Sequence, residues 1–177
     1  MQNDLLLIKE IIIRDPPTKW DLVYKKPKFD KNGKLVTKQS FYLTGNLFYA
    51  DRTSYHITSK IINESKQFLL GHLRGFPELE KISINFEYHK PTHIDLDNKS
   101  SYWIKLFLDI LKTPSVKQER GANLKKKDII SVRCIPDDNT KHITEINTKF
   151  VLGEHLMIFR IYGRVANQQK EMDLFFK

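Results

Sequence analysis

The sequence contains a single cysteine, Cys134, and no apolar stretch long enough to cross a membrane as a helix. One thiol cannot form a disulfide within the chain, and a cysteine-based zinc site needs more than one thiolate. A membrane-spanning helix needs about 20 consecutive apolar residues. We therefore expect no disulfide framework, no cysteine-ligated zinc and no membrane span, with Cys134 buried as an ordinary core thiol.

The N-terminal residues lack the features of a secretory signal. Asp4 precedes a short apolar run, residues 5–8, which Lys9 and Glu10 interrupt. A signal peptide begins with basic residues and continues with a longer apolar region. We therefore expect a cytoplasmic protein.

Positive charge exceeds negative charge in this chain. Its 177 residues include 30 Lys and Arg against 21 Asp and Glu, which gives a net charge of +9. A surplus of this size favours a polyanionic partner, either a nucleic acid or an anionic membrane surface. The length indicates one domain, residues 1–177, and the 40% of hydrophobic residues suffices for a core.

Apolar periodicity predicts a mixed β-sheet with helices packed on it, in the α/β (α+β) class. Residues 81–88 alternate between apolar and polar types, as a half-buried strand does. Helical spacing predicts helices over 53–70 and 99–112. Further strands are expected at residues 5–13, 128–135, 142–151 and 155–163.

Two segments concentrate lysines, and we interpret both as basic loops. The first, residues 18–45, includes Lys25, Lys26 and Lys28, and the second, an inserted loop at 113–127, ends in Lys125, Lys126 and Lys127. Asn32-Gly33 is a strong turn signal that can join two strands of a hairpin. Runs of charge are usually solvated surface, and the alternative is a flap that contacts DNA phosphates.

Acidic pairs follow two of the expected strands. Asp95 and Asp97 come after the strand at 81–88, and Asp137 and Asp138 come after the strand at 128–135. If those strands are neighbours, both pairs meet at one edge of the sheet. Adjacent carboxylates repel each other unless a cation lies between them, and Mg²⁺ prefers oxygen ligands. The pattern predicts a site for Mg²⁺, with Mn²⁺ as the alternative.

Each acidic pair also has an ordinary structural interpretation. Asp97 or Asn98 is a suitable N-cap for the helix expected at 99–112, and Asp-Asp-Asn is a common turn sequence. His93 precedes Asp95 by two residues, and we expect it to contact a phosphate or make a structural hydrogen bond rather than to bind metal.

The combination of motifs resembles the RusA family of Holliday junction resolvases. The resemblance rests on Asp-Leu-Asp-Asn at 95–98, Lys105 followed by Leu108-Asp109, an apolar strand leading to Asp137-Asp138, and a closing hairpin at 142–163. It implies a homodimeric, Mg²⁺-dependent endodeoxyribonuclease that makes paired symmetric nicks across a four-way DNA junction, in recombination and repair.

The resemblance also implies roles for individual residues. Asp95, Asp97 and Asp138 would be the catalytic carboxylates, with Asp137 as a further metal ligand. Lys105 would contact phosphate, with Lys99 as its rival because the spacing from Asp97 to Asp109 is longer than the family pattern.

Two other functions remain open from the sequence. One is a nuclease that cuts flaps or forks, and the other is a non-catalytic protein that binds branched DNA. Carboxylates that lie far apart in the structure would favour the non-catalytic protein. A dimer with two-fold symmetry suits a four-way junction. The apolar tail, Leu174-Phe175-Phe176, would either join that interface or pack on its own core.

Overall fold

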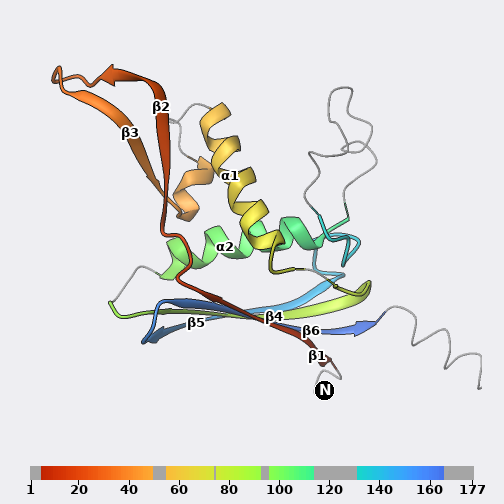
Figure 1. Ribbon diagram of the computed structural model, residues 1–177. Helices are drawn as coiled ribbons and strands as arrows, with labels where there is room; N and C mark the ends of the chain where they lie inside the picture. The colour runs from red at the N-terminus through yellow and green to blue at the C-terminus, as the bar shows by residue number, and fades with distance from the viewer. Residues whose placement is uncertain (1–4, 50–54, 74, 93–95, 114–130, 166–177) are drawn as a thin grey trace, which may run out of the picture.

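The main sheet has four strands and mixes parallel with antiparallel pairing (Figure 1). The computed structural model describes residues 5–49, 55–73, 75–92, 96–113 and 131–165. The strand order is β1-β6-β4-β5, where β4 and β5 are parallel and the other two pairs are antiparallel. The strands are β1 (Leu6–Arg14), β4 (Leu79–Lys90), β5 (Ile143–Leu152) and β6 (Leu156–Val165). The expected mixed α+β class is confirmed.

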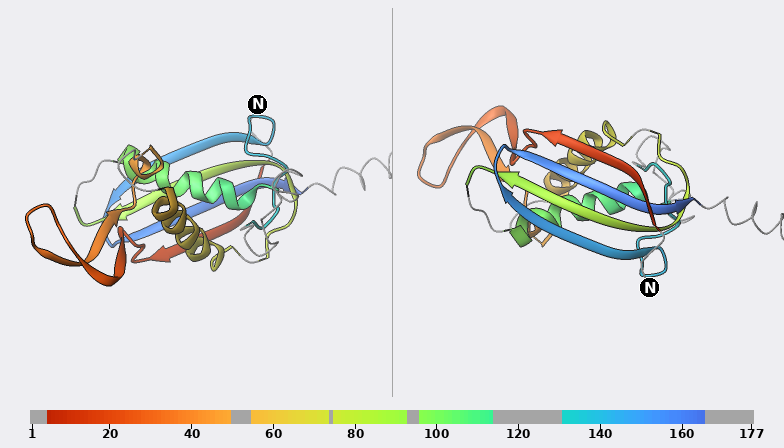
Figure 2. Two further views of the ribbon diagram at one scale, coloured as in Figure 1. Left: turned by 90° about the horizontal axis from the view of Figure 1, so that it is seen from above. Right: turned by 90° about the horizontal axis from the view of Figure 1, so that it is seen from below.

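One face of the main sheet is covered by α2 (Leu96–Leu111), as Figure 2 shows from both sides. Alternate side chains of β4 from Ile82 to Tyr88 point toward this helix and are buried, because successive residues of a strand face opposite sides. The ring of Phe107 in α2 stacks on Phe159 of β6, with ring centroids 4.2 Å apart. This helix–sheet layer is the centre of the core.

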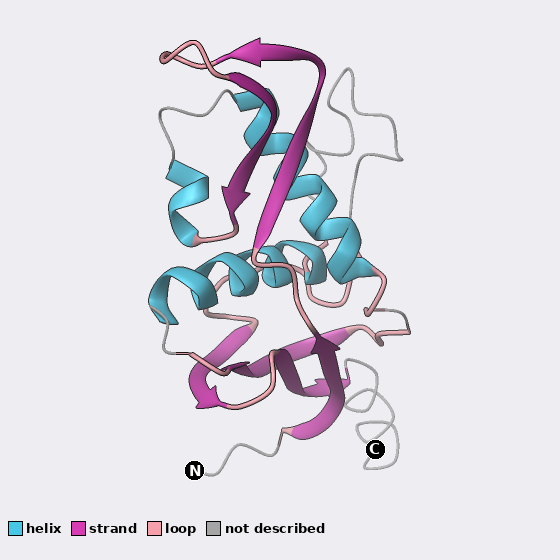
Figure 3. Ribbon diagram, turned by 60° about the vertical axis from the view of Figure 1, so that its left-hand side comes forward, coloured by secondary structure: helices cyan, strands magenta, loops and turns pink. Residues whose placement is uncertain are grey.

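A second helix, α1 (Tyr55–Leu70), packs on the side of α2 that faces away from the sheet (Figures 1 and 3). Its buried residues are Ile61, Ser65 and Leu69. The Tyr102 hydroxyl of α2 donates a buried hydrogen bond to Ser65 Oγ at 2.8 Å. The described helices include none that is long and apolar enough to span a bilayer.

A two-stranded antiparallel hairpin projects from this body (Figure 1, red to orange). It consists of β2 (Lys19–Phe29) and β3 (Leu35–Tyr42), and a short 3-10 helix, η1 (Gly45–Tyr49), follows it. Near the body, Trp20 and Leu22 are half-buried and Phe41 is buried, whereas nearly every residue from Lys25 to Leu35 is exposed. We call this hairpin, residues 19–42, the arm. The hairpin interpretation of Asn32-Gly33 is confirmed.

Two expectations from the sequence are wrong. We expected a strand at 128–135, of which the structure describes residues 131–135. These residues form no strand and make one isolated bridge, between Ile135 and Lys112. Their backbone N–H groups instead bond to the last carbonyls of α2: Val132 N to Ile110 O at 2.8 Å and Cys134 N to Leu111 O at 2.7 Å. Free carbonyls at a helix end need such partners, and this requirement competes with strand pairing.

The start of α2 differs from the expected boundary as well. The helix begins at Leu96 rather than at residue 99, so Asp97 and Asn98 belong to its first turn and are not its N-cap. The inserted basic loop at 113–127 lies outside the described residues from residue 114 onward.

Candidate nucleic-acid interface and acidic segments

The outer half of the arm carries a strong positive charge. Residues 25–36 contain five lysines, at positions 25, 26, 28, 31 and 34, and one acidic residue, Asp30. Asp30 is used within the turn, where its Oδ1 accepts hydrogen bonds from the backbone N–H groups of Asn32 (2.8 Å) and Lys34 (2.9 Å). The φ angle of Gly33, 74°, lies in the left-handed region that glycine adopts without strain.

A bulge separates the inner half of the arm from the outer half. Val23 pairs with Lys38 and Lys28 pairs with Val36, so the four residues 24–27 of β2 face the single residue 37 of β3. The side chain of Tyr24 bridges the strands at this point, because its hydroxyl donates to Gln39 Oε1 at 2.6 Å. Lys28 Nζ lies 4.7 Å from the centroid of the Tyr24 ring. A bulge bends a strand, so it sets the direction of the arm tip.

The tip exposes two apolar side chains among its lysines. Phe29 and Leu35 are cross-strand partners, and they are 74% and 53% exposed. An aromatic side chain as exposed as Phe29 lacks the stabilisation that burial of its ring would give to the free chain. Aromatic and basic side chains side by side are what a nucleic acid contacts through its bases and phosphates.

The two acidic segments lie at opposite ends of the main sheet. β4 ends at Lys90, before Asp95, while β5 begins at Ile143, after Asp138. The strands are parallel, and Ile82 is opposite Ile143 whereas Lys90 is opposite Leu152. At about 3.3 Å per residue, the end of β4 is roughly 26 Å from the start of β5. The carboxylate pairs therefore do not meet at one edge of the sheet, and this expectation is wrong.

The helix α2 separates the same two segments. Asp97 lies in its first turn, and Lys112, which follows its last residue, contacts Asp138. Fifteen residues of helix between positions 97 and 112 correspond to about 22 Å along the axis. β1 ends at Arg14 and β4 ends at Lys90 at the same end of the sheet, where α2 begins. The base of the arm also lies there (Figure 1), and we call this end of the sheet the arm end.

Asp137 stabilises its own turn. Its Oδ1 accepts a hydrogen bond from the backbone N–H of Asp138 at 2.9 Å, and its Oδ2 accepts one from Asn139 Nδ2 at 2.8 Å. The hydrogen bond from the Asp138 backbone, followed by further contacts from Asp138 and Asn139, lowers the pKa of Asp137 below its ordinary value. This is the turn role that Asp-Asp-Asn indicated in the sequence.

Asp138 belongs to a chain of ion pairs at the C-terminal end of α2. Lys112 Nζ lies 3.1 Å from Asp138 Oδ2 and 3.6 Å from Asp109 Oδ1, and Asp109 Oδ2 lies 2.8 Å from Lys66 Nζ of α1. Partial burial acts to lower the pKa of Lys112, but the hydrogen bond to Asp138 and the charge of Asp109 raise it above its ordinary value overall. Cations at a helix C-terminus also interact favourably with the helix dipole.

The predicted lysines are distributed over several places. Lys105 is exposed midway along α2, with Nζ 4.9 Å from the centroid of the Phe48 ring in η1. Its rival Lys99 lies in the first two turns of α2, but the side chains of residues 96–99 fall outside the described part. His93, Asp95 and the Lys125–Lys127 run lie outside the described residues, as does the apolar tail.

A single metal ion does not fit the whole predicted carboxylate set in one copy of the chain. Asp137 and Asp138 are engaged with Asn139 and Lys112, about 22 Å from Asp97 along the axis of α2. The described residues contain no group of three or more His, Cys, Asp or Glu side chains placed to hold a metal ion. A metal ion bound near Asp97 would have to do without Asp137 and Asp138 of the same copy.

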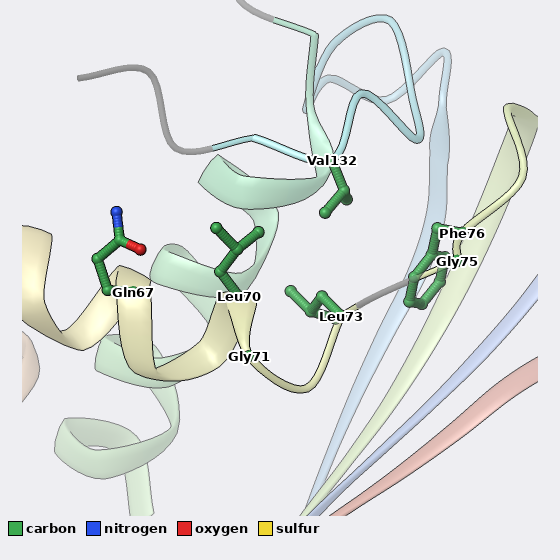
Figure 4. A pocket seen from close by; sticks show the side chains of 7 residues that line it. All are labelled: Gln67, Leu70, Gly71, Leu73, Gly75, Phe76 and Val132. Carbon is green, nitrogen blue, oxygen red and sulfur yellow. The ribbon is translucent and has the colours of Figure 1, made fainter. Parts of the chain in front are cut away.

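A cavity with a mainly apolar lining opens on the described part of the chain. It has a volume of about 510 Å³ and lies where α1 ends and the chain turns toward β4 (Figure 4). Leu70, Leu73, Phe76 and Val132 give it an apolar lining, and Gln67 supplies a polar group at its edge. The described part of its lining includes no acidic or basic residue, so that part offers none of the chemistry that the sequence predicted.

The sheet face away from α2 carries a charged network that the sequence analysis missed. The Arg160 guanidinium on β6 donates to Glu10 on β1 and to Glu87 on β4, the latter at 2.7 Å. His89 Nε2 lies 3.0 Å from the second oxygen of Glu87. The polar residues of the alternating segment at 81–88 could have indicated this network, because they predict a sheet face that no helix covers.

Comparisons of the chain with family models, with curated proteins and with solved structures found no match.

Proposed function

We propose that this protein binds nucleic acid through the arm, with branched DNA as the expected substrate. The observation that carries the proposal is the five-lysine outer half of a projecting hairpin, whose one acidic residue is used by its own turn. A two-stranded ribbon fits the major groove of DNA, and its lysines then neutralise phosphates on either side. Branched DNA follows from the RusA resemblance, and the homodimer is part of the same hypothesis.

The wide separation of the two acidic segments supports a binding function. Affinity in this case comes from phosphate contacts and from the counterions that they release. The experiment measures the dissociation constant for a labelled four-way junction and for linear duplex of equal length at several salt concentrations. A variant with Lys25, Lys26 and Lys28 changed to Gln should flatten the slope of log K against log salt by about 2.7, or about 0.9 for each phosphate that the variant no longer neutralises.

A control variant separates the arm from charge in general. Lys66→Gln removes a lysine that is paired with Asp109 inside the body, and it should leave the salt slope unchanged. An arm variant with the same slope as the unaltered protein would refute the role of the arm. Equal affinity for junction and linear duplex would refute the preference for branches.

A second candidate function is the endonuclease implied by the RusA resemblance. One observation favours it: Leu96, Asp97 and Asn98 of the Asp-Leu-Asp-Asn segment lie in the first turn of α2 at the arm end, beside the base of the arm that would hold DNA. Cleavage of an end-labelled junction with Mg²⁺ or Mn²⁺ tests it directly. Paired nicks that disappear in Asp97→Asn, with binding retained, would establish the nuclease. Binding without cleavage under these conditions would assign the chain to non-catalytic binding.

A further inference from the structure

One edge of the main sheet, along β5, is open. The inner side of β5 pairs with β4, and no described strand pairs with its outer side. Six consecutive residues of β5, 144–149, are exposed. Ile146 is 40% exposed. Such an edge presents unpaired N–H and C=O groups and is a ready template for another strand.

The sequence of β5 is self-complementary around Asn147. When two copies of this strand pair antiparallel about a two-fold axis through Asn147, Glu145 of each copy is opposite Lys149 of the other. Both side chains point to the sheet face away from α2, because Glu145 pairs with Ser83 and Lys149 pairs with Glu87, on that side of β4. Opposite charges directly across two strands attract, and the symmetry supplies the attraction twice.

The residues between these charges also match. Ile146 of one copy is opposite Thr148 of the other, on the face that carries α2, so the pairing covers an apolar side chain that is exposed in the single chain. Asn147 keeps its own hydrogen bond to Asn85, with Nδ2 3.1 Å from Oδ1. The register of β5 on β4 is regular from Glu145 to Leu152, which keeps the outer edge straight where the second copy would bind.

The opposite edge of the sheet is less suited to this role. β1 has a register irregularity between Leu7 and Lys9, and irregularities of this kind protect sheet edges from pairing. An antiparallel pairing of β1 with itself around Glu10 would place two carboxylates together on the axis, where like charges repel.

We infer that two copies of this chain pair through the β5 edge, giving one continuous eight-stranded sheet with Glu145–Lys149 contacts on both sides of the axis. A second consequence concerns charge at the ends of β5. The antiparallel pairing places the Asp137–Asp138 turn of one copy at the same end of the joined sheet as the Lys90 end of β4 in the other copy. The first turn of α2, with Asp97, belongs to that same end.

The experiment uses two charge-reversal variants of the full chain and sedimentation velocity over a range of concentrations. Glu145→Lys or Lys149→Glu alone places like charges opposite each other twice, and each should weaken dimerisation by about tenfold or more. An equimolar mixture of the two variants restores both attractive pairs and should dimerise as the unaltered chain does. The double variant, with both changes in one chain, should do the same.

Three outcomes would overturn the inference: an unaltered chain that stays monomeric, single variants that dimerise normally, or a mixture that fails to recover. Thermal unfolding of the Glu145→Lys variant should match that of the unaltered monomer, since Glu145 is exposed and lies beside the uncharged Ser83, and this shows that a lost dimer is not a lost fold. Lys149→Glu places a second carboxylate beside Glu87, so recovery of the dimer in the mixture is the control for that variant. The inference specifies the homodimer of the proposed function, and because the measurement contains no DNA, its failure is distinguishable from a failure of DNA binding by the arm.

Discussion

Lys112 and Asp138 form an ion pair across the end of α2, with Nζ 3.1 Å from Oδ2. The contact joins a residue just after the helix to the turn that precedes β5, and Asp109 extends it to Lys66 of α1. Asp138 thereby fixes where the chain re-enters the sheet. Its carboxylate already has a cation, and that cation is a lysine of the same chain.

Asp138→Asn should lower the free energy of unfolding by about 0.5–1 kcal/mol, because a partly exposed ion pair contributes that much. Binding of DNA should not change, since the arm is remote from this turn. Chemical denaturation and a binding titration of the same variant check both statements.

A double-mutant cycle that combines Asp138→Asn with Lys112→Met provides the control, because it measures the interaction energy between the two residues. We call this energy the coupling, and it should be present at pH 7. The raised pKa of Lys112 means that the coupling is complete below the ordinary value of 10.5 and is lost as pH rises through the folded-state value. An unchanged coupling well above that range would show that the two residues do not form an ion pair.

Glu87→Gln should make stability less sensitive to acid. The hydrogen bond from His89, and those from Arg160, lower the pKa of Glu87 below 4.5 although burial opposes them. A carboxylate with a lowered pKa contributes stability above its unfolded-state pKa and loses it as pH falls through the folded-state value. The variant should therefore be less stable at pH 7 by about 1 kcal/mol, and the difference should shrink below about pH 4.

Glu80→Gln, at an exposed position of the same strand, is the matched comparison. It should keep the acid dependence of the unaltered chain. Parallel pH profiles for the unaltered chain and Glu87→Gln would mean that the lowered pKa of Glu87 does not contribute to the acid dependence of stability.

Gly163→Ala should destabilise the sheet by about 1–3 kcal/mol. A Cβ at this position of β6 would lie 2.9 Å from Leu79 Cδ1 and 3.1 Å from the Lys81 carbonyl oxygen, and the carbonyl belongs to the central strand and cannot move aside. Gly153→Ala, in the turn between β5 and β6, meets no atom within 4 Å and should stay within about 0.5 kcal/mol of the unaltered chain. Equal melting temperatures for the two variants would contradict the packing around Gly163.

Phe29→Ala should weaken binding of a four-way junction more than binding of linear duplex. A branch point exposes the faces of bases that a duplex keeps stacked, and stacking on an aromatic ring contributes about 1–3 kcal/mol per base. Val23→Ala, at a comparably exposed position further from the tip, should affect neither substrate. Equal losses on the junction and the duplex would show that Phe29 does not contact bases.

The sequence predicted the elements whose signals are local. The alternation of residues 81–88 indicated β4, helical spacing indicated α1 and α2, and Asn32-Gly33 indicated the turn of the arm. It missed features that depend on which strands pair. Nothing in the sequence states that β4 and β5 run parallel, yet this pairing places Asp97 and Asp138 at opposite ends of the sheet. The apolar run before Pro136 resembled a strand, but its backbone bonds to the end of α2 instead.

The central position of β4 also determines when this protein can fold. Both of its neighbours, β5 and β6, lie more than 50 residues later in the chain, and β1 pairs with β6 as well. A chain that emerges from the ribosome with its N-terminus first exposes β1 and β4 long before their partners exist. Sheet formation must therefore wait until β6 has been synthesised, and until then the apolar side of β4 depends on α2 or on a chaperone for cover.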